Sequence, residues 1–238
     1  MSMYPDSQSR PFELDYGTDD KAVFHFFNTV YAWMCVGLGV TATVAWLGSQ
    51  HMAFMQAIAG RGVAVAFLLG TALLAYSIRA AAAKLSPMVA TGLFLLFAAI
   101  IGAFLSFIFL IYPMQTIVGS FVMTAGVFGG MSVYGFVTKR DLTKMGSILI
   151  MCVWGLFLAT IVNIFIASSA VSWIITYAVL AVFIGLVAYD TQMLKQMALQ
   201  TQGDVKLAQR YAIVGSLSLY VDFINIFMSI LRIMGSRR

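Results

Sequence analysis

The chain has 238 residues, of which 61% are hydrophobic and only 10% are charged, and its mean hydropathy is +0.94. A soluble domain needs far more polar surface, so this composition excludes a soluble globular protein and indicates an integral membrane protein. The net charge of +5 does not indicate nucleic-acid binding, because the basic residues lie in short stretches between apolar blocks rather than on one basic face.

The chain begins with a polar, acidic segment. Residues 1–22 carry five acidic residues, two prolines and a glycine, and they lack the basic stretch and apolar run of a secretory signal. Low hydrophobicity of this kind favours disorder. We therefore expect residues 1–22 to form a disordered tail and residues 23–236 to form one transmembrane domain.

Seven apolar blocks follow, separated by short polar breaks. Each is about 20 residues or longer, the length that a helix needs to cross the hydrocarbon layer. Pro87 and Pro113 stand at the starts of the third and fourth blocks, where the missing N–H group of proline is tolerated. The pattern predicts an all-α integral membrane protein with seven transmembrane helices. Their expected positions are residues 24–48, 54–79, 88–111, 114–137, 146–167, 171–195 and 209–232.

Small residues in the fourth block predict close helix packing. Thr116, Ser120 and Thr124 form a row at four-residue spacing, and Gly126 with Gly130 forms a GxxxG motif. Both patterns are typical of helix interfaces in membranes.

The distribution of loop lysines and arginines predicts the orientation. Ten of the 14 basic residues lie on the side of the amino terminus and four on the other side, so the amino terminus is predicted to be cytoplasmic. A last block that re-entered would improve the ratio to 13 against 1. We nevertheless predict that it crosses, because its 21 residues, Tyr211 to Leu231, span about 31 Å as a helix.

This last block carries an acid, Asp222, in its middle. A carboxylate at that depth costs about 2.5–3.5 kcal/mol on insertion scales, so it must face protein or water. Steps of four and three residues place Asp222 in a stripe of polar and small side chains on one helix face. The other members are Tyr211, Gly215, Ser218, Asn225 and Ser229. The last helix is therefore predicted to be the central helix of the bundle.

Two further ionisable residues lie near the membrane. Asp190 is in the sixth block, and Arg79 ends the second, where an arginine also suits the helix dipole and the headgroups without any function. Asp190 lies level with Asp222 only if the sixth helix continues past Lys195 to Gln200, and we expect this because the segment has no helix breaker. Two adjacent carboxylates in low dielectric cannot both be charged cheaply, so such a pair responds to pH and attracts cations.

No enzymatic motif is complete. Tyr189–Asp190 resembles the YD motif of presenilin-type aspartyl proteases, but the second acid, Asp222, has no GxGD context and the PAL motif is absent. The zinc-protease motif HExxH and a phosphate-binding loop are also absent. We expect neither enzymatic activity nor a cofactor.

Two segments together resemble the Bax-inhibitor family, whose members carry the transmembrane Bax inhibitor motif. They are AYDTQ, Ala188 to Gln192, and SLSLYVDFINIF, Ser216 to Phe227. The loop TKRDL at 138–142, followed by Met145–Gly146, is similar to the bacterial branch. The resemblance covers residues 20–236 and implies a seven-helix protein of a bacterial inner membrane whose last helix is surrounded by the other six.

The resemblance also implies a function. It assigns Asp190 and Asp222 to a pH-sensing pair that contacts Ca²⁺ transiently, and Arg79 to a latch, in a protein that leaks Ca²⁺ across its membrane. An alternative is a non-conducting interaction protein that modulates a membrane-anchored AAA protease, with the acidic tail as docking segment. A third is a proton-coupled transporter. All three require the lipid bilayer as a partner.

Overall fold

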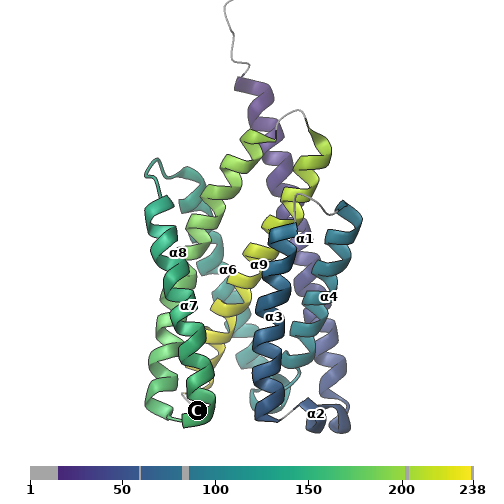
Figure 1. Cartoon of the computed structure of the whole chain (residues 1–238), viewed down its shortest axis with the longest axis vertical. Helices are drawn as coiled ribbons and strands as arrows, with labels where there is room; N and C mark the ends of the chain where they lie inside the picture. Colours follow the sequence, from purple (N-terminus) through teal and green to yellow (C-terminus); the bar gives the residue numbers. More distant parts are fainter. Residues whose placement is uncertain (1–15, 59, 82–85, 202–203, 237–238) are drawn as a thin grey trace, which may run out of the picture.

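The computed structural model describes residues 16–58, 60–81, 86–201 and 204–236, and every element within these ranges is an α-helix. The helices are α1 (Tyr16–Ser49), α2 (Met52–Ile58), α3 (Arg61–Ala81), α4 (Pro87–Leu105), α5 (Ile108–Ile111), α6 (Met114–Val137), α7 (Thr143–Ile166), α8 (Ser169–Gln200) and α9 (Val205–Gly235). They form one elongated bundle (Figure 1).

Within the described residues, six candidate spans are long and apolar enough to cross a membrane, and one of them combines α4 with the short α5. The bent pair of α2 and α3 makes a seventh if it is counted as one span. The all-α membrane fold is therefore confirmed. The prediction of one continuous helix over 54–79 was wrong, because α2 and α3 meet at 80°. Gly60 and Gly62 flank Arg61 at this break, and glycine weakens a helix interior while a charge resists apolar burial.

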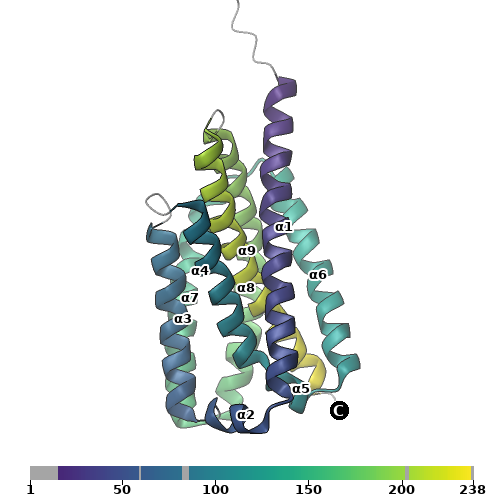
Figure 2. The same cartoon turned by 90° about the vertical axis from the view of Figure 1, so that its right-hand side faces the viewer.

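The first helix also differs from its expected bounds. α1 begins at Tyr16 instead of following residue 22, so part of the segment assigned to a disordered tail is helical. Residues 1–15 lie outside the described part of the chain. Figure 2 shows that the first turns of α1 extend beyond the other helices at that end of the bundle.

Polar residues just before the apolar blocks cap the amino-terminal ends of two helices. The Ser86 hydroxyl accepts from the Val89 N–H group at the start of α4, and Ser168 accepts from Val171 at the start of α8. Pro113 precedes α6, as its position in the sequence predicts. The two serine caps satisfy N–H groups that have no partner within the helix.

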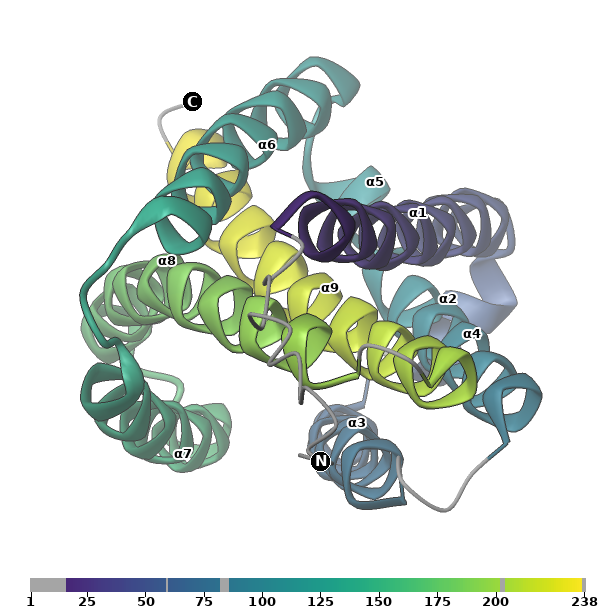
Figure 3. The same ribbon diagram turned by 90° about the horizontal axis from the view of Figure 1, so that it is seen from above.

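The core of the bundle lies along α9. In the most apolar 18-residue stretch of α9, 67% of the residues are buried, against at most 33% in the corresponding stretch of any other candidate span. Figure 3, a view along the bundle, shows α9 between α8 and α1, and it packs against α1, α4, α6 and α8, with a shorter contact to α3. α7 packs on α8 and lies on the outside, so it reaches α9 mainly through α8. The predicted central position of the last helix is confirmed.

α9 is one continuous helix that runs from the end where α1 begins to the opposite end (Figures 1 and 2). At that far end the Arg232 guanidinium donates to the Ser172 hydroxyl at 2.6 Å and lies 5.2 Å from the centre of the Trp173 ring. Both partners belong to the first turns of α8. This course is the one that a crossing requires, and it differs from a re-entrant segment.

Close helix contacts fall at different glycines from those that the sequence singled out. Gly126 and Gly130 are exposed, and a Cβ at either position would meet none of the described atoms. The contact is instead at Gly135, where a Cβ would collide with the backbone of Ala188 on α8. The predicted row of Thr116, Ser120 and Thr124 is buried, so this half of the packing prediction is correct.

Candidate functional site

The polar stripe of α9 turns inward along its whole length. Gly215, Ser218, Asp222 and Ser229 are buried, and Tyr211 and Asn225 are half-buried. Only 4% of Asp222 is exposed, although it lies in the middle of the helix. The stripe is therefore on a protein-facing side of α9.

The lower part of the stripe is satisfied within the helix itself. Asn225 Nδ2 donates to the Val221 carbonyl at 2.8 Å, and Ser229 Oγ donates to the Asn225 carbonyl at 2.8 Å. Bonds of this kind to the carbonyl four residues earlier let polar groups sit in an apolar bundle without a partner on another helix. These two side chains therefore need no hydrogen bond to another helix.

The upper part of the stripe faces α8. A Cβ at Gly215 would collide with the side chain of Leu194, so the absence of a side chain at Gly215 lets α8 and α9 approach at this level. α8 and α9 run in opposite directions (Figure 1). The contact between Gly215 and Leu194 therefore sets which residues of the two helices lie level.

From this contact the depths of the two acids can be compared. Asp190 lies four residues before Leu194 on α8, which is about 6 Å along the helix axis. Asp222 lies seven residues after Gly215 on α9, which is about 10.5 Å. Because the helices are antiparallel, both displacements point toward the end of the bundle where α9 ends. Steps of four and seven residues keep each acid on the same helix face as its contact residue. Asp190 and Asp222 thus lie on facing sides of α8 and α9, with levels that differ by about 4.5 Å.

This agreement in depth depends on the length of α8. The helix runs from Ser169 to Gln200, as the absence of a helix breaker after Lys195 predicts. Asp190 is half-buried, in contrast to the fully buried Asp222. A direct hydrogen bond between the two carboxyl groups stays a prediction.

The residue predicted as the latch is Arg79. Arg79 belongs to the last turn of α3, but its side chain lies outside the described part of the structure. α3 contacts α9, α7 and α4, so the helix that carries Arg79 lies next to the central helix.

A second polar row of α9, on a different face from the stripe, joins α9 to α1. The Ser216 hydroxyl lies 2.9 Å from the Val30 carbonyl, and the Tyr220 hydroxyl lies 2.6 Å from Thr41 Oγ1. Both side chains are fully buried. Sequence reasoning missed this row, although its four-residue spacing within SLSLY was a signal.

The rings of α4 enclose this hydroxyl pair. Phe94 and Phe97 contact the Tyr220 ring edge-on, with centroids 5.6 and 6.0 Å away. Thr41 also lies 2.9 Å from the Ala98 carbonyl. One buried hydroxyl pair therefore connects α1, α4 and α9, and it holds the central helix on the side away from α8.

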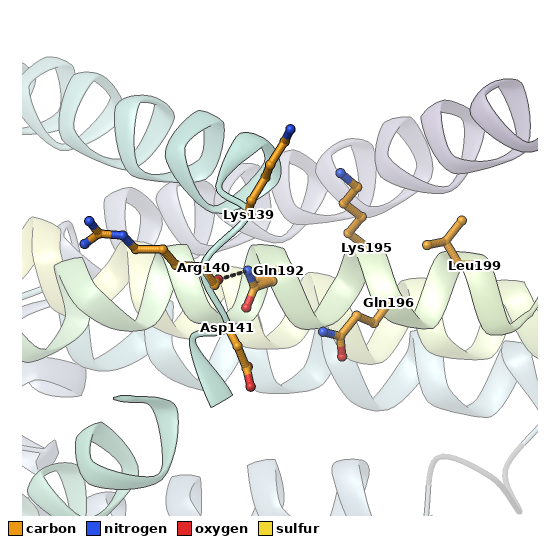
Figure 4. A pocket seen from close by; sticks show the side chains of 7 residues that line it. All are labelled: Lys139, Arg140, Asp141, Gln192, Lys195, Gln196 and Leu199. Carbon is orange, nitrogen blue, oxygen red and sulfur yellow. Dashed lines mark hydrogen bonds between the residues drawn. The ribbon is translucent and has the colours of Figure 1, made fainter. Parts of the chain in front are cut away.

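No role was predicted for Gln192, which connects the AYDTQ segment to the TKRDL loop. Gln192 follows Asp190 by two residues. Its Nε2 donates to the Arg140 carbonyl at 2.8 Å (Figure 4). Its Oε1 accepts from the Leu142 N–H group at 2.9 Å. The AYDTQ segment of α8 thus holds the TKRDL loop between α6 and α7. The separation of 50 residues explains why no local pattern shows this contact.

The same loop carries an acid shortly before α7. Asp141 Oδ1 accepts from the Thr143 N–H group at 2.9 Å. Hydrogen bonds from the Thr143 side chain and backbone, with a smaller contribution from the nearby Lys144, hold the pKa of the Asp141 carboxyl below its usual value. Asp141 is exposed, so this interaction orders the loop and does not belong to the buried acid site.

Among the residues that the structure describes, no three His, Cys, Asp or Glu side chains come together as metal ligands. The acids of α8 and α9 supply at most two carboxylates. Ca²⁺ takes six to eight oxygen ligands, so any ion at these residues keeps most of its water.

Comparison with known proteins places these features in context. Residues 23–238 match the profile of the family described as Inhibitor of apoptosis-promoting Bax1. The chain is 44% identical over 215 residues to the Inner membrane protein YbhL of Escherichia coli K12. This alignment covers 90% of this chain and 92% of YbhL. An uncharacterized protein of Borreliella burgdorferi is 42% identical over 90% of this chain and 92% of its own length. An uncharacterized membrane protein of Streptococcus pyogenes is 34% identical over 92% of this chain and 96% of its own length.

Proposed function

The chain belongs to the Inhibitor of apoptosis-promoting Bax1 family, and on that premise we propose that this multi-pass membrane protein is a pH-sensitive leak pathway for Ca²⁺ or another cation. In this proposal Asp190 and Asp222 form the gate and Arg79 latches it. The observation that carries the proposal is the buried Asp222 in the middle of the central helix, on the face that meets α8 at about the depth of Asp190.

The physical argument starts from the cost of the buried acid. A carboxylate at mid-membrane depth is retained against about 2.5–3.5 kcal/mol, and packing alone does not need it. Two acids on facing helices repel each other when both are charged, so the charge of the pair changes with pH. A cation that enters between them relieves this repulsion.

The pathway in this proposal is narrow and hydrated. Ser218, Asn225 and Ser229 continue the polar stripe on both sides of Asp222, and two of them bond within their own helix. A passing ion exchanges some of its water for these oxygens and for the two carboxylates. Transport without chemical conversion needs no catalytic residue and no cofactor.

Flux through the purified full chain in liposomes tests the proposal. Asp222→Asn keeps the shape of the side chain but cannot titrate, so the Ca²⁺ leak between about pH 5 and 8 should change and lose its dependence on pH. Asp204→Asn is the matched control, because Asp204 is exposed at the start of the same helix and an Asn can still cap it. Equal flux from Asp222→Asn and the unmodified chain at every pH would refute the proposal.

We also propose that the protein lies in a bacterial inner membrane with its amino terminus in the cytoplasm. The excess of lysine and arginine at the end where α1 begins supports this orientation. Labelling of single introduced cysteines at both ends of α9 in sealed cells tests it.

The second candidate is a non-conducting interaction protein that modulates a membrane protease. It is supported by the first turns of α1, which extend beyond the bundle (Figure 2) and carry Asp19 and Asp20. Removal of residues 1–20 should abolish capture of a membrane-anchored AAA protease, and the full chain should add no Ca²⁺ flux to liposomes. Capture that survives the removal would contradict this candidate.

A further inference from the structure

A basic cavity lies at the end of the bundle where α1 begins, between α8 and the loop that joins α6 to α7. Its volume is about 280 Å³. That is just below the range of about 300–1,000 Å³ for ligand sites, so it suits a small headgroup. The residues that line it are Lys139, Arg140, Asp141, Gln192, Lys195, Gln196 and Leu199. Three of them are cations and one is an acid.

Lys195 is held in place at this cavity. Its ammonium nitrogen donates to the Phe136 carbonyl at 3.0 Å and lies 4.6 Å from the centre of the Phe136 ring. One of its three N–H groups is engaged by that bond, and two are left to bind an anion. Because the ammonium is already positioned, binding an anion requires little further ordering of the side chain.

Acidic and basic side chains lie on different sides of the loop. Figure 4 shows Lys139 and Lys195 extending to the same side of α8, whereas Asp141 points to the other side and Arg140 points away from Lys195. The Asp141 carboxylate accepts from Thr143 at the start of α7. The pair of lysines therefore forms a cationic face that Asp141 does not enter.

This cationic face borders an exposed apolar surface. Leu199 lines the cavity and is 47% exposed, and Phe24 on α1 is 60% exposed and packs against Phe136 with ring centroids 6.1 Å apart. Val137 at the end of α6 is 68% exposed. On a membrane protein such side chains contact lipid, so cations and acyl-chain contacts occur together here.

From this arrangement we propose that Lys139 and Lys195 bind the phosphate of an anionic lipid headgroup. The chemistry that they recognise is a phosphate group, and the adjoining apolar surface favours a lipid over a soluble phosphate as its source. Basic pockets between helices at the cytoplasmic end are suited to such headgroups. This site is separate from the acids of α8 and α9, and the lipid connects the loop after α6 to α8.

Native mass spectrometry of the full chain in nonionic detergent, with dioleoylphosphatidylglycerol as probe, tests this site. The dissociation constant should rise about fivefold for Lys139→Gln, since each basic residue near the surface contributes about that factor. Lys195→Gln should have at least this effect. Lys206→Gln, an exposed lysine at the same end but on α9, is the control and should leave binding unchanged.

Two further measurements decide the source of the phosphate. Dioleoylphosphatidylcholine should bind more weakly than the anionic lipid, and inorganic phosphate at the lipid's own concentration should not displace it. Equal binding of both lipids, displacement by inorganic phosphate, or equal effects of Lys139→Gln and Lys206→Gln would overturn the proposal. Lys139 is exposed and is absent from the packed core, so its variant folds and decides the outcome even if Lys195→Gln does not.

Discussion

Removal of either partner of the Thr41–Tyr220 hydroxyl pair should destabilise the bundle by different amounts. Thr41 Oγ1 lies 3.0 Å from the Gly37 carbonyl and 2.9 Å from the Ala98 carbonyl. Its single hydrogen is donated to these carbonyls, which accept only, so the 2.6 Å contact is a bond that Tyr220 donates. Tyr220 therefore depends on Thr41, whereas Thr41 keeps a carbonyl acceptor without Tyr220.

The magnitudes follow from this asymmetry. Tyr220→Phe removes one bond and leaves Thr41 satisfied, so we expect the free energy of unfolding to fall by about 0.6 kcal/mol, a typical value for bonds between membrane helices. Thr41→Val has nearly the same shape but leaves the fully buried Tyr220 hydroxyl without its acceptor. That variant should lose about 1–3 kcal/mol.

Reversible unfolding of the full chain in mixed micelles, with an increasing fraction of denaturing detergent, measures these differences through tryptophan fluorescence. Thr43→Val is the matched control, because Thr43 is on the same helix and bonds to the Gly39 carbonyl at an exposed position. It should cost little. If Thr41→Val proves no more costly than Tyr220→Phe or Thr43→Val, the assignment of donor and acceptor is wrong.

Three further predictions concern the loop and the helix contacts. Gln192→Leu removes both hydrogen bonds to the loop after α6, so the loop amides should exchange with solvent faster. Substitution of the exposed Gln196 by Leu should leave hydrogen exchange unchanged. Equal exchange in both variants would contradict the role of Gln192 in holding the loop. Gly135→Ala forces a Cβ against the backbone of α8, so the free energy of unfolding should fall by about 1–3 kcal/mol in the same assay. Gly126→Ala should leave it unchanged. Equal losses in the two variants would refute the contact at Gly135. The Asp141 carboxyl should titrate below 3.8 in an NMR titration. Its folded pKa is lowered, so the stability that it contributes is present above the unfolded pKa and is lost as pH falls through the folded pKa. A pKa at or above 3.8 would contradict the hydrogen bonds from Thr143 to this carboxylate.

Hydropathy was sufficient to predict most of the fold. Apolar blocks of membrane length and the positions of Pro87 and Pro113 placed six of the spans close to the observed helices. The second span was misjudged because Gly60 and Gly62 were read as part of one apolar block. A hydropathy average does not detect so short a break between two helices, although the glycines around Arg61 were a local sign of it.

The central helix was predictable because its polar residues repeat on one face. A stripe through Gly215 and Asp222 needs a protein-facing side, whichever helices supply it. The spacing of Gly126 and Gly130 is equally regular, but spacing alone does not say which face of a helix turns inward. Gly135, which makes the contact, has no such pattern.

Contacts between distant segments could not be predicted from local patterns. Thr41 and Tyr220 are 179 residues apart, and Gln192 is 52 residues from Arg140. Both bonds depend on the order in which the helices surround α9. The relative depth of Asp190 and Asp222 was partly predictable. The length of α8 could be predicted from the sequence, but the contact of Gly215 with Leu194 could not.

The central claim, that Asp190 and Asp222 act as one gate, is tested most directly by a double-mutant cycle of Ca²⁺ flux. Liposomes with Asp190→Asn, Asp222→Asn and the double variant are compared across the same pH range. If the acids form one titrating pair, the double variant should resemble the stronger single variant. Effects of the two substitutions that simply multiply, each with its own pH dependence, would show independent sites and contradict the gate.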